Sequence, residues 1–338
     1  MSDSENTLSG STINQEYPWH QSTWQKFIQA RTKNHLPHAI LLSGEEGIAK
    51  FPLAKRMAKS LLCMNTVSNA TDACNQCQSC KTYESGANPD FTQITLLEDK
   101  QQIGVDQIRA LSEFLNYSRS YNTNRVVILN PVERMNLNAA NSLLKSLEEP
   151  SAHTVIILVT AKINQLLPTI KSRCQLFNVA TPSKTDSVHW LQQQSQQNQE
   201  SSVDVEAALE ITGNKPLKAI TISQEDLDSR NQFFHDLSSV ISQNISITEM
   251  AKKWEKHDVE TLLNWQILLI QKAIKHSLST VKTTDNSSTS NNPLTKHLSA
   301  EDHWHLYQNL IKQKQYIHTS VNSLMFVENM IMLWLKAD

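Results

Sequence analysis

Four short runs of β-branched and aliphatic residues stand out in the first half of the chain. Each run is apolar at successive positions, which is typical of a parallel strand covered by helices on both faces. The runs are HAILLSG (38–44), DFTQITL (90–96), RVVILN (125–130) and TVIILVTA (154–161). Segments with helical periodicity separate them, among them 50–62 and 138–150. Strands that alternate with helices predict a doubly wound α/β domain over residues 17–180.

After residue 180 the strand-like runs disappear, and apolar residues recur at helical spacing instead. From residue 223 onward long segments of this kind dominate, and they include 262–278 and 321–335. The sequence therefore predicts an all-helical C-terminal domain over 223–338. Its last segment is apolar around most of the circumference of a helix, which indicates that it is buried. The surface that covers it is either the core of its own domain or another subunit.

Three polar tracts flank or interrupt these domains. Residues 1–16 offer almost nothing that a core could bury, and we expect them to be disordered. The Gln-rich tract 191–202 is expected to be a solvated helix end or a loop, and the Ser/Thr/Asn-rich tract 280–293 a mobile loop. The chain lacks an apolar run of roughly 18 residues, and its start lacks the apolar core of a signal peptide. We therefore expect a soluble, cytoplasmic protein.

Charge is nearly balanced along the chain. The 31 basic residues against 33 acidic ones give a net charge of -2. Neutralising the phosphates of DNA without regard to sequence needs a surplus of Lys and Arg. The composition thus argues against sequence-independent DNA binding by this chain alone, and it leaves open DNA contacts that partner subunits supply.

The stretch LLSGEEGIAKF has the outline of a phosphate-binding loop between a strand and a helix. A working loop, G-x-x-x-x-G-K-[S/T], closes backbone amides around phosphates, neutralises them with Lys and binds Mg²⁺ through the hydroxyl. Gly44 and Lys50 stand at the first glycine and the lysine position, with Gly47 between them. Ala49 replaces the second glycine, and Phe51 replaces the hydroxyl residue. Ala is strained where φ is positive, and a Phe ring cannot hold a metal.

A second motif that ATP hydrolysis needs is also missing. In phosphoryl-transfer sites of this fold class an acidic residue at the end of a neighbouring strand holds Mg²⁺. The run 126–129 leads instead to Asn130 and Pro131, and Glu133 points elsewhere unless the turn is unusual. Three interpretations stand: an active ATPase, an inherited loop without activity, and a chance likeness. Defects in two separate motifs argue against hydrolysis and favour the inherited, inactive loop.

Four cysteines fall within one short stretch in the spacing C-x10-C-x2-C-x2-C. They are Cys63, Cys74, Cys77 and Cys80. Four thiolates that converge from tight C-x2-C turns suit tetrahedral Zn²⁺, and a cytoplasmic chain argues against disulfides. The alternatives are an iron–sulfur cluster, whose expected fourth Cys is replaced by Glu84, and unconnected thiols. A closed four-thiolate site would be structural. Cys174 stands apart and is interpreted as a small buried hydrophobe.

Several ordered motifs together resemble the bacterial clamp-loader family of AAA+ proteins. They are the degenerate phosphate loop, the four-Cys insert, NSLLKSLEEP (141–150) and LLPTIKSRC (166–174), in this order. Further stretches are similar to the same family: YPWH (17–20), HAILLSG (38–44), NPDF (88–91) and VDQIR (105–109). The resemblance is dense over 17–180 and ordinary through GNKPLKAI (213–220), and in the C-terminal domain it rests on helical character.

The resemblance implies a fold and an assembly. It implies an α/β AAA+ module over 17–180 with a zinc-binding insert at 63–80, a small helical lid domain over 181–222, and an all-α C-terminal collar domain for oligomerisation over 223–338. Clamp loaders are hetero-oligomeric rings that use ATP to open the sliding clamp and close it around primed DNA. The implied partners are the motor (tau/gamma) subunits, the delta subunit, the clamp and the DNA, within the DNA polymerase III holoenzyme.

The resemblance also implies a role for this chain within the ring. The motif Ser172-Arg173-Cys174 would present Arg173 in trans, as an arginine finger, to the ATP of a neighbouring motor subunit. Read alone, Arg173 would be a surface ion pair. Ala49, Phe51, Asn130 and Pro131 are similar to the non-hydrolysing subunits of the family, and Pro216 stands where motor subunits carry a nucleotide-binding Arg. Weak anion binding at Lys50 stays open.

Two rival functions stand beside this one. An active AAA+ ATPase with a structural zinc would show Mg²⁺-dependent hydrolysis by the isolated chain. A zinc-containing nucleic-acid-binding module would show salt-sensitive affinity for DNA. The stretch 74–91 around the cysteines has one Lys and no Arg, whereas phosphate contacts want several cations.

Overall fold

The computed structural model describes residues 17–65, 72–98, 100–121, 124–198, 203–279, 294–295, 298–317 and 322–336. These residues form two units. One comprises the described residues up to 198 together with 214–220, and the other comprises 203–213 and 221–336. The tracts 1–16 and 280–293, for which disorder and a mobile loop were expected, and the end of the tract 191–202 lie outside the described residues.

The first unit is built on a five-stranded parallel sheet in the order β2-β3-β4-β1-β5. The strands are β1 (Ala39–Ser43), β2 (Phe91–Ile94), β3 (Arg125–Leu129), β4 (Thr154–Thr160) and β5 (Gln175–Asn178). All residues of β1, β3 and β4 are buried, as the unbroken apolar runs predict. The four strands expected from the sequence are confirmed. The fifth strand, β5, was not expected.

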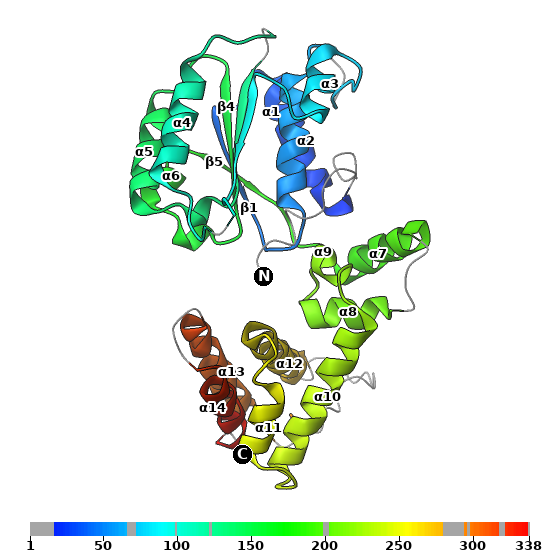
Figure 1. Ribbon diagram of the computed structural model, residues 1–338. Helices are drawn as coiled ribbons and strands as arrows, with labels where there is room; N and C mark the ends of the chain where they lie inside the picture. The colour runs from blue at the N-terminus through cyan, green and yellow to red at the C-terminus, as the bar shows by residue number, and fades with distance from the viewer. Residues whose placement is uncertain are drawn as a thin grey trace. The chain divides into compact units, whose positions relative to one another are not determined.

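Helices cover both faces of this sheet (Figure 1). α1, α2 and α3 lie on one face, and α4, α5 and α6 lie on the other. The helices of this unit are α1 (Gln21–Thr32), α2 (Lys50–Leu62), α3 (Gln78–Glu84), α4 (Val105–Asn116), α5 (Leu137–Glu148), α6 (Pro168–Lys171), α7 (Lys184–Asn198) and α9 (Pro216–Ala219). Buried side chains of α4 and α5 form one core with the sheet, among them Leu111 and Leu143. The layered α/β arrangement that the alternation predicts is present.

The ends of α5 follow from local chemistry. The side chain of Asn136 caps its start by accepting a hydrogen bond from the backbone N–H of Ala139 at 2.8 Å. The helix ends at Glu148, two residues earlier than the sequence pattern predicts. Pro150 disfavours helical dihedrals in the residue before it, and Glu149 has already left the helix with φ -121° and ψ 70°.

Residues 181–222 hold three helices. They are α7 and α9 of the first unit and α8 (Val205–Thr212) of the second. The described part of the tract 191–202 is the C-terminal half of α7. That 181–222 forms a separate lid domain stays a prediction.

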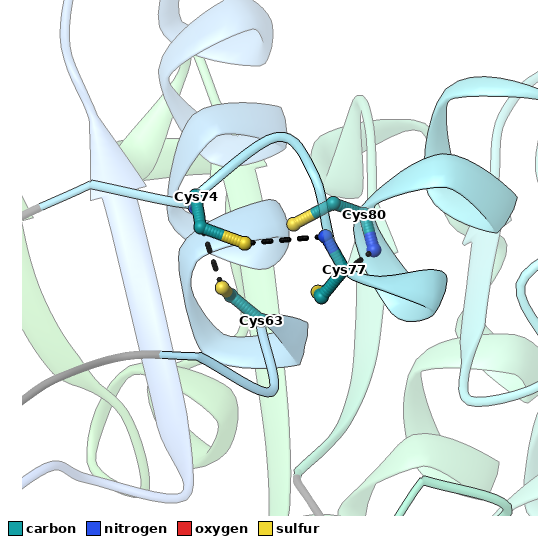
Figure 2. Close-up of side chains that lie close together, drawn as sticks. All are labelled: Cys63, Cys74, Cys77 and Cys80. Carbon is teal, nitrogen blue, oxygen red and sulfur yellow. Dashed lines mark hydrogen bonds between the residues drawn. The ribbon is translucent and has the colours of Figure 1, made fainter.

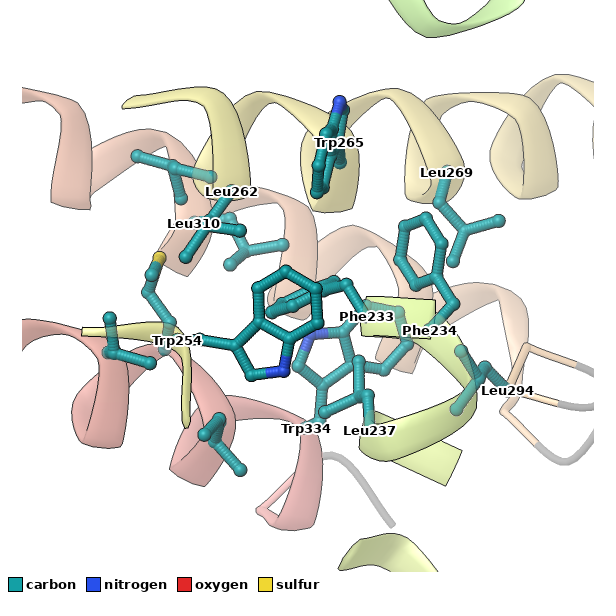
Figure 3. Packing of buried hydrophobic residues seen from close by; sticks show 14 of the residues in the cluster. Phe233, Phe234, Leu237, Trp254, Leu262, Trp265, Leu269, Leu294, Leu310 and Trp334 are labelled. Atoms are coloured by element: carbon teal, nitrogen blue, oxygen red, sulfur yellow. The ribbon is translucent and has the colours of Figure 1, made fainter. Parts of the chain in front are cut away.

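The second unit is all-helical, as predicted. Besides α8 it contains α10 (Gln224–Ile241), α11 (Ile247–Trp254), α12 (Val259–Ser279), α13 (Ala300–Gln313) and α14 (Ser323–Leu335). Its core packs aromatic rings from several helices, with Phe233, Trp254 and Trp334 near its centre (Figure 3). The indole N–H of Trp334 donates to Oε1 of Gln266 at 2.7 Å, so the polar atom is satisfied within the core. The apolar last helix is therefore covered by its own unit. None of the described helices is long and apolar enough to cross a membrane.

Candidate functional site

The degenerate loop connects the end of β1 to the start of α2. Ala49, the last residue before the helix, has φ 62° and ψ 36°, a left-handed conformation that costs a non-glycine residue about 1 kcal/mol. The positive φ expected at this position is therefore present, although the residue is Ala and not Gly. At the other end of the loop, a Cβ on Gly44 would lie 2.7 Å from the carbonyl oxygen of Val179. The loop thus has a left-handed residue at its end and a glycine without room for a side chain at its start.

The two chemical positions of the loop are turned inward. Lys50 is 1% exposed, and its ammonium group donates a hydrogen bond to the carbonyl oxygen of Glu45 in the same loop. Phe51 is buried at the position where a hydroxyl would hold Mg²⁺, and the Lys55 ammonium lies 4.4 Å from the centre of its ring. The lysine is therefore engaged by the loop itself, and the metal position is filled by an apolar ring.

Aromatic side chains from the start of the described chain hold the loop from one side. The indole N–H of Trp19 donates to the carbonyl oxygen of Ile48 at 2.8 Å, and Nε2 of His20 lies 2.9 Å from the same oxygen. Because a carbonyl only accepts, Nε2 of His20 carries the proton in this contact. Tyr17 and Trp190 of α7 pack on these rings, with the Tyr17 and Trp190 centroids 5.5 Å apart. These four residues are the aromatic cluster.

Burial lowers the pKa of His20 to about 4. The imidazolium form would lose its hydration in this site, and the hydrogen bond to Ile48 offsets only part of that loss. His20 is therefore neutral near pH 7, and its single ring N–H is committed to the loop.

Residues around the start of α9 hold the loop from another side. The backbone N–H of Leu217 donates to the carbonyl oxygen of Gly47 at 3.3 Å, and Lys218 forms an ion pair of 3.0 Å with Glu46. Burial by itself would raise the pKa of Glu46, and the Lys218 ammonium brings it below its usual value. Pro216 begins α9 and is buried. Three successive residues of the loop, from Glu46 to Ile48, therefore have partners within the chain.

The end of β3 presents no carboxylate to the loop. Asn130 is 7% exposed, and its backbone N–H donates to the carbonyl oxygen of Ile94 at 2.9 Å. Glu133 lies in a short 3₁₀ turn (Val132–Arg134) after Pro131, and its Oε1 accepts from the backbone N–H of Ala161 at 3.0 Å. The one acidic residue near this strand end is thus bound to the segment that follows β4.

The four cysteines of the insert come together in space (Figure 2). Their sulfur atoms all lie within 4.8 Å of one another. A zinc ion with four bonds of about 2.3 Å has sulfur–sulfur edges of about 3.8 Å, so the cluster is close to the size that zinc requires. Three backbone N–H groups of the cysteines donate to neighbouring sulfurs: Cys74 to Cys63 at 3.3 Å, Cys77 to Cys74 at 3.3 Å, and Cys80 to Cys77 at 3.4 Å. Such donors stabilise thiolates, and the donor set fits a structural zinc site.

The cysteines differ in their surroundings. A hydrogen bond from the backbone of Gln76 lowers the pKa of the Cys74 thiol to about 6, which favours the thiolate that a metal binds. Burial raises the pKa of Cys63 and Cys80. A cation that binds all four sulfurs would compensate the cost of two buried thiolates.

Polar contacts fasten the insert to α2. Nε of Arg56 donates to Oδ1 of Asp72 at 3.0 Å, and Lys59 pairs with Glu84. The hydroxyl of Tyr83 donates to the carbonyl oxygen of Lys55 at 3.1 Å. The insert is therefore a local extension of the helix that follows the loop.

Arg173 lies in the turn between α6 and β5. Its Nη2 lies 2.6 Å from Oε1 of Glu148, and its Nη1 donates to the carbonyl oxygen of Thr169 at 3.0 Å and to Oγ of Ser172 at 3.3 Å. About a third of the Arg173 side chain is exposed. Cys174 is half-buried against the core, and burial raises its pKa to about 12. In the isolated chain Arg173 therefore forms a surface ion pair, which is the alternative to a finger that the sequence left open.

The structure brings together residues that the sequence reasoning did not connect. Trp19 and His20 lie in YPWH, and Lys218 lies in GNKPLKAI; both stretches were noted for their resemblance and without a structural role. Glu148 lies in NSLLKSLEEP, and its pairing with Arg173 was not expected. The sequence marked these residues only by their presence in motifs. It could not indicate their contacts, because local spacing carries no information about contacts between distant segments.

Known proteins match this chain over most of its length. A family profile described as DNA polymerase III, delta subunit matches residues 19–183. DNA polymerase III subunit delta' of Pseudomonas aeruginosa is 35% identical over 250 residues, which are 74% of this chain and 74% of that protein. The protein of the same name from Haemophilus influenzae is 29% identical over 263 residues, 78% of each chain. A solved DNA polymerase III gamma subunit-related protein from Thermotoga maritima covers 92% of this chain and 99% of its own, with 19% identity and a TM-score of 0.40.

The parallel sheet between helices, the loop after β1 and the helical C-terminal unit define an AAA+-type protein. In the loop after β1, Ala49 is left-handed, and Lys50 and Phe51 are buried. The chain belongs to the family of DNA polymerase III delta-prime subunits.

Proposed function

We propose that this chain is the non-hydrolysing, stator subunit of a DNA polymerase III clamp loader. In that role it helps to load the sliding clamp onto primed DNA during replication, in the cytoplasm. Its partners would be the motor (tau/gamma) subunits and the delta subunit, in a hetero-oligomeric ring. It would act as a component of a DNA-directed DNA polymerase holoenzyme without ATPase activity of its own. Membership of the delta-prime family supports this assignment.

The observation that carries the non-hydrolysing role is the state of the loop. A phosphate-binding loop works by directing backbone N–H groups and a free lysine ammonium at the phosphates. Here Lys50 is buried and donates to the loop's own carbonyl at Glu45. Phe51 fills the metal position, and Asn130 is the residue that follows β3. ATP binding for hydrolysis would require breaking these contacts and supplying two missing metal ligands.

Arg173 is the residue through which the chain would act on a neighbour's ATP. A guanidinium is planar and always charged, and it stabilises negative charge that spreads over a transferring phosphoryl group. Such fingers contribute on the order of 10³–10⁵ to the rate in known cases. The partial exposure of Arg173 and its place in a short turn support a role in contact with another subunit. The ion pair with Glu148 would be exchanged for the neighbour's phosphates on assembly.

The cysteine insert would have a structural role. Cys63, Cys74, Cys77 and Cys80 would hold one Zn²⁺, which ties the insert to the end of α2. The polar contacts of Arg56 and Lys59 with the insert support this interpretation.

The test uses the complete complex, reconstituted with the motor and delta subunits, the clamp and primed DNA. Steady-state ATPase is compared for wild type, Arg173→Ala, Lys171→Ala and Lys50→Met, after assembly of each has been confirmed. We expect a partial fall with Arg173→Ala only, because the other ATP sites keep their own fingers. Lys171→Ala is the matched control, since it removes a nearby cation at the end of α6. A fall with Lys50→Met and none with Arg173→Ala would overturn the proposal.

A further inference from the structure

The guanidinium of Arg173 is held at both of its terminal nitrogens, and different parts of the fold hold them. Nη1 donates to the carbonyl oxygen of Thr169 at 3.0 Å and to Oγ of Ser172 at 3.3 Å. Nη2 lies 2.6 Å from Oε1 of Glu148. Thr169 lies in α6 and Ser172 directly follows it, whereas Glu148 is the last residue of α5. Arg173 is therefore held on one side by its own turn and on the other by a separate helix.

The hydroxyl group of Ser172 links the contacts on the side of the turn. Its Oγ donates to the carbonyl oxygen of Thr169 at 3.1 Å and accepts from Nη1 of Arg173. A hydroxyl group has one donor and two acceptor lone pairs, so it makes both contacts at once. Both partners of Nη1 lie within four residues of Arg173 in the chain, so they stay with the side chain when the turn moves as a whole.

The turn that carries Arg173 is anchored in the core of its unit. Pro168 begins α6 with a fixed backbone φ. Ile170 is 1% exposed and belongs to the apolar core on the sheet, and Cys174 packs against the same core. The core thus fixes the backbone on both sides of Arg173, and Ser172 restricts the direction of its side chain.

The ion pair with Glu148 is the contact that an incoming phosphate can replace. Its side chains are 34% and 48% exposed, and ion pairs at such positions contribute little to stability. Carboxylate and phosphate oxygens are both charged acceptors for a guanidinium. In the isolated chain Glu148 therefore holds the nitrogen that a phosphate oxygen would otherwise engage.

We propose that Ser172 is a positioning residue for Arg173. It keeps Nη1 on its own turn while Nη2 exchanges Glu148 for a phosphate oxygen of the neighbouring subunit's ATP. This inference rests on the proposed role of Arg173 as a finger, and it adds how the finger is directed. Ordering a long, flexible side chain on binding costs free energy, and a hydrogen bond that is already present in the free chain removes part of that cost. Placement of the charge then favours the transition state.

The test measures steady-state ATPase of the complete complex over a range of ATP concentrations, after folding and assembly of each variant have been confirmed. The finger-dependent rate is the difference in kcat between wild type and Arg173→Ala. Ser172→Ala should lower this rate about fivefold, the equivalent of one ordinary hydrogen bond, without raising KM for ATP. Ser172→Thr keeps the hydroxyl group and should restore the rate. Ser151→Ala is the matched control, because it removes an exposed hydroxyl group from the turn before β4.

Glu148→Gln should act on KM and not on kcat. The amide keeps an acceptor oxygen for Nη2 and loses the charge that competes with phosphate, so KM for ATP should fall about threefold. Glu149→Gln is the control for this variant, since it removes a neighbouring charge that has no contact with Arg173. An unchanged KM in Glu148→Gln would overturn the exchange at Nη2.

The double variant separates positioning from a general structural effect. Ser172→Ala should change nothing further in the Arg173→Ala background, because a positioning residue acts only through its arginine. A further fall in the double variant would overturn the proposal. If Arg173→Ala lowers the rate and Ser172→Ala does not, this inference fails and the proposed function stands. If Arg173→Ala has no effect, the finger and its positioning residue are both overturned.

Discussion

At the residue scale, the carbonyl oxygen of Ile48 couples the loop to the aromatic cluster. It accepts the ring N–H groups of both Trp19 and His20. This loop is fastened to two rings that precede the sheet in sequence. The hydrogen bonds are buried, so each contributes more to order than an exposed contact would.

The titration of His20 should appear in the stability of the protein. Its pKa is about 4 in the folded chain against 6.5 in the unfolded chain, so the unfolded state takes up the proton first as pH falls. This contribution is complete above pH 6.5 and is lost progressively down to about pH 4. Its size is on the order of 3 kcal/mol. Urea unfolding at pH values from 4 to 8 should show a flatter dependence for His20→Gln.

The difference in the pH dependence of stability between wild type and His20→Gln reports on His20 alone, since every other titratable group is present in both proteins. The control is His35→Gln, a variant of a histidine outside the aromatic cluster and the loop. Parallel curves for wild type and His20→Gln would contradict the assignment of a neutral, buried imidazole.

The ion pair of Arg173 leads to a prediction about stability. Both partners are partly exposed, 34% for Arg173 and 48% for Glu148, and exposed pairs contribute less than about 1 kcal/mol. Arg173→Ala and Glu148→Gln should therefore lower the free energy of unfolding by no more than that amount. Denaturant unfolding of each variant measures it, with Glu149→Gln as the neighbouring control. A loss of several kcal/mol for Arg173→Ala would mean that its role is in folding, and ATPase data on the variant would then say little about a finger.

At the element scale, the cysteine insert is a small unit whose four sulfur atoms lie close together. We expect a structural metal to supply part of the folding free energy of this segment, because metal binding to a preformed set of ligands adds to folding stability. Purified protein should contain about one zinc per chain. Cys77→Ala should lose it, and Cys174→Ala should retain it, because Cys174 lies apart from the cluster.

Metal content by mass spectrometry checks this prediction, and hydrogen exchange of residues 72–84 reports the accompanying loss of order. Exchange in β1 and β3 should be unaffected in Cys77→Ala, since these strands are buried by other contacts. Equal zinc content in the two variants would contradict a four-cysteine site.

The runs that form β1, β3 and β4 could be predicted because these strands are buried on both faces, which leaves an unbroken apolar pattern. β5 is an edge strand in which Phe177 alone is buried, so it lacks a strand pattern. β5 forms because it pairs with the edge of β1, and a local sequence pattern does not indicate such pairing.

The candidate site divides in the same way. The four cysteines and the altered loop could be recognised because their residues are close in sequence. The contact of Trp19 with Ile48 joins residues 29 positions apart. The contact of Arg173 with Glu148 joins the turn after α6 to the end of α5. Such contacts depend on the relative placement of elements by the sheet, so they became visible only in the structure.

At the scale of the whole molecule, the two units have separate cores. The first holds the loop, the insert and Arg173, whereas the second holds an aromatic core in which the buried carboxylate of Asp236 accepts the indole N–H of Trp254 at 2.9 Å. The burial of α14 determines whether the second unit can fold without a partner subunit. Its sequence is apolar almost all round, and the structure buries five of its side chains: Phe326, Val327, Met330, Ile331 and Trp334.

Replacing Trp334 with Ala should destabilise the second unit by about 3–5 kcal/mol, because it opens a cavity and leaves Gln266 without its indole partner. Met325→Ala on the exposed side of the same helix should change stability by less than about 0.5 kcal/mol. Thermal and denaturant unfolding of the isolated chain measure both. If Trp334→Ala left the isolated chain as stable as wild type but prevented assembly with the partner subunits, the buried side of α14 would be an interface. A large loss in the isolated chain means that α14 completes the core of its own unit, and that assembly must use other surfaces.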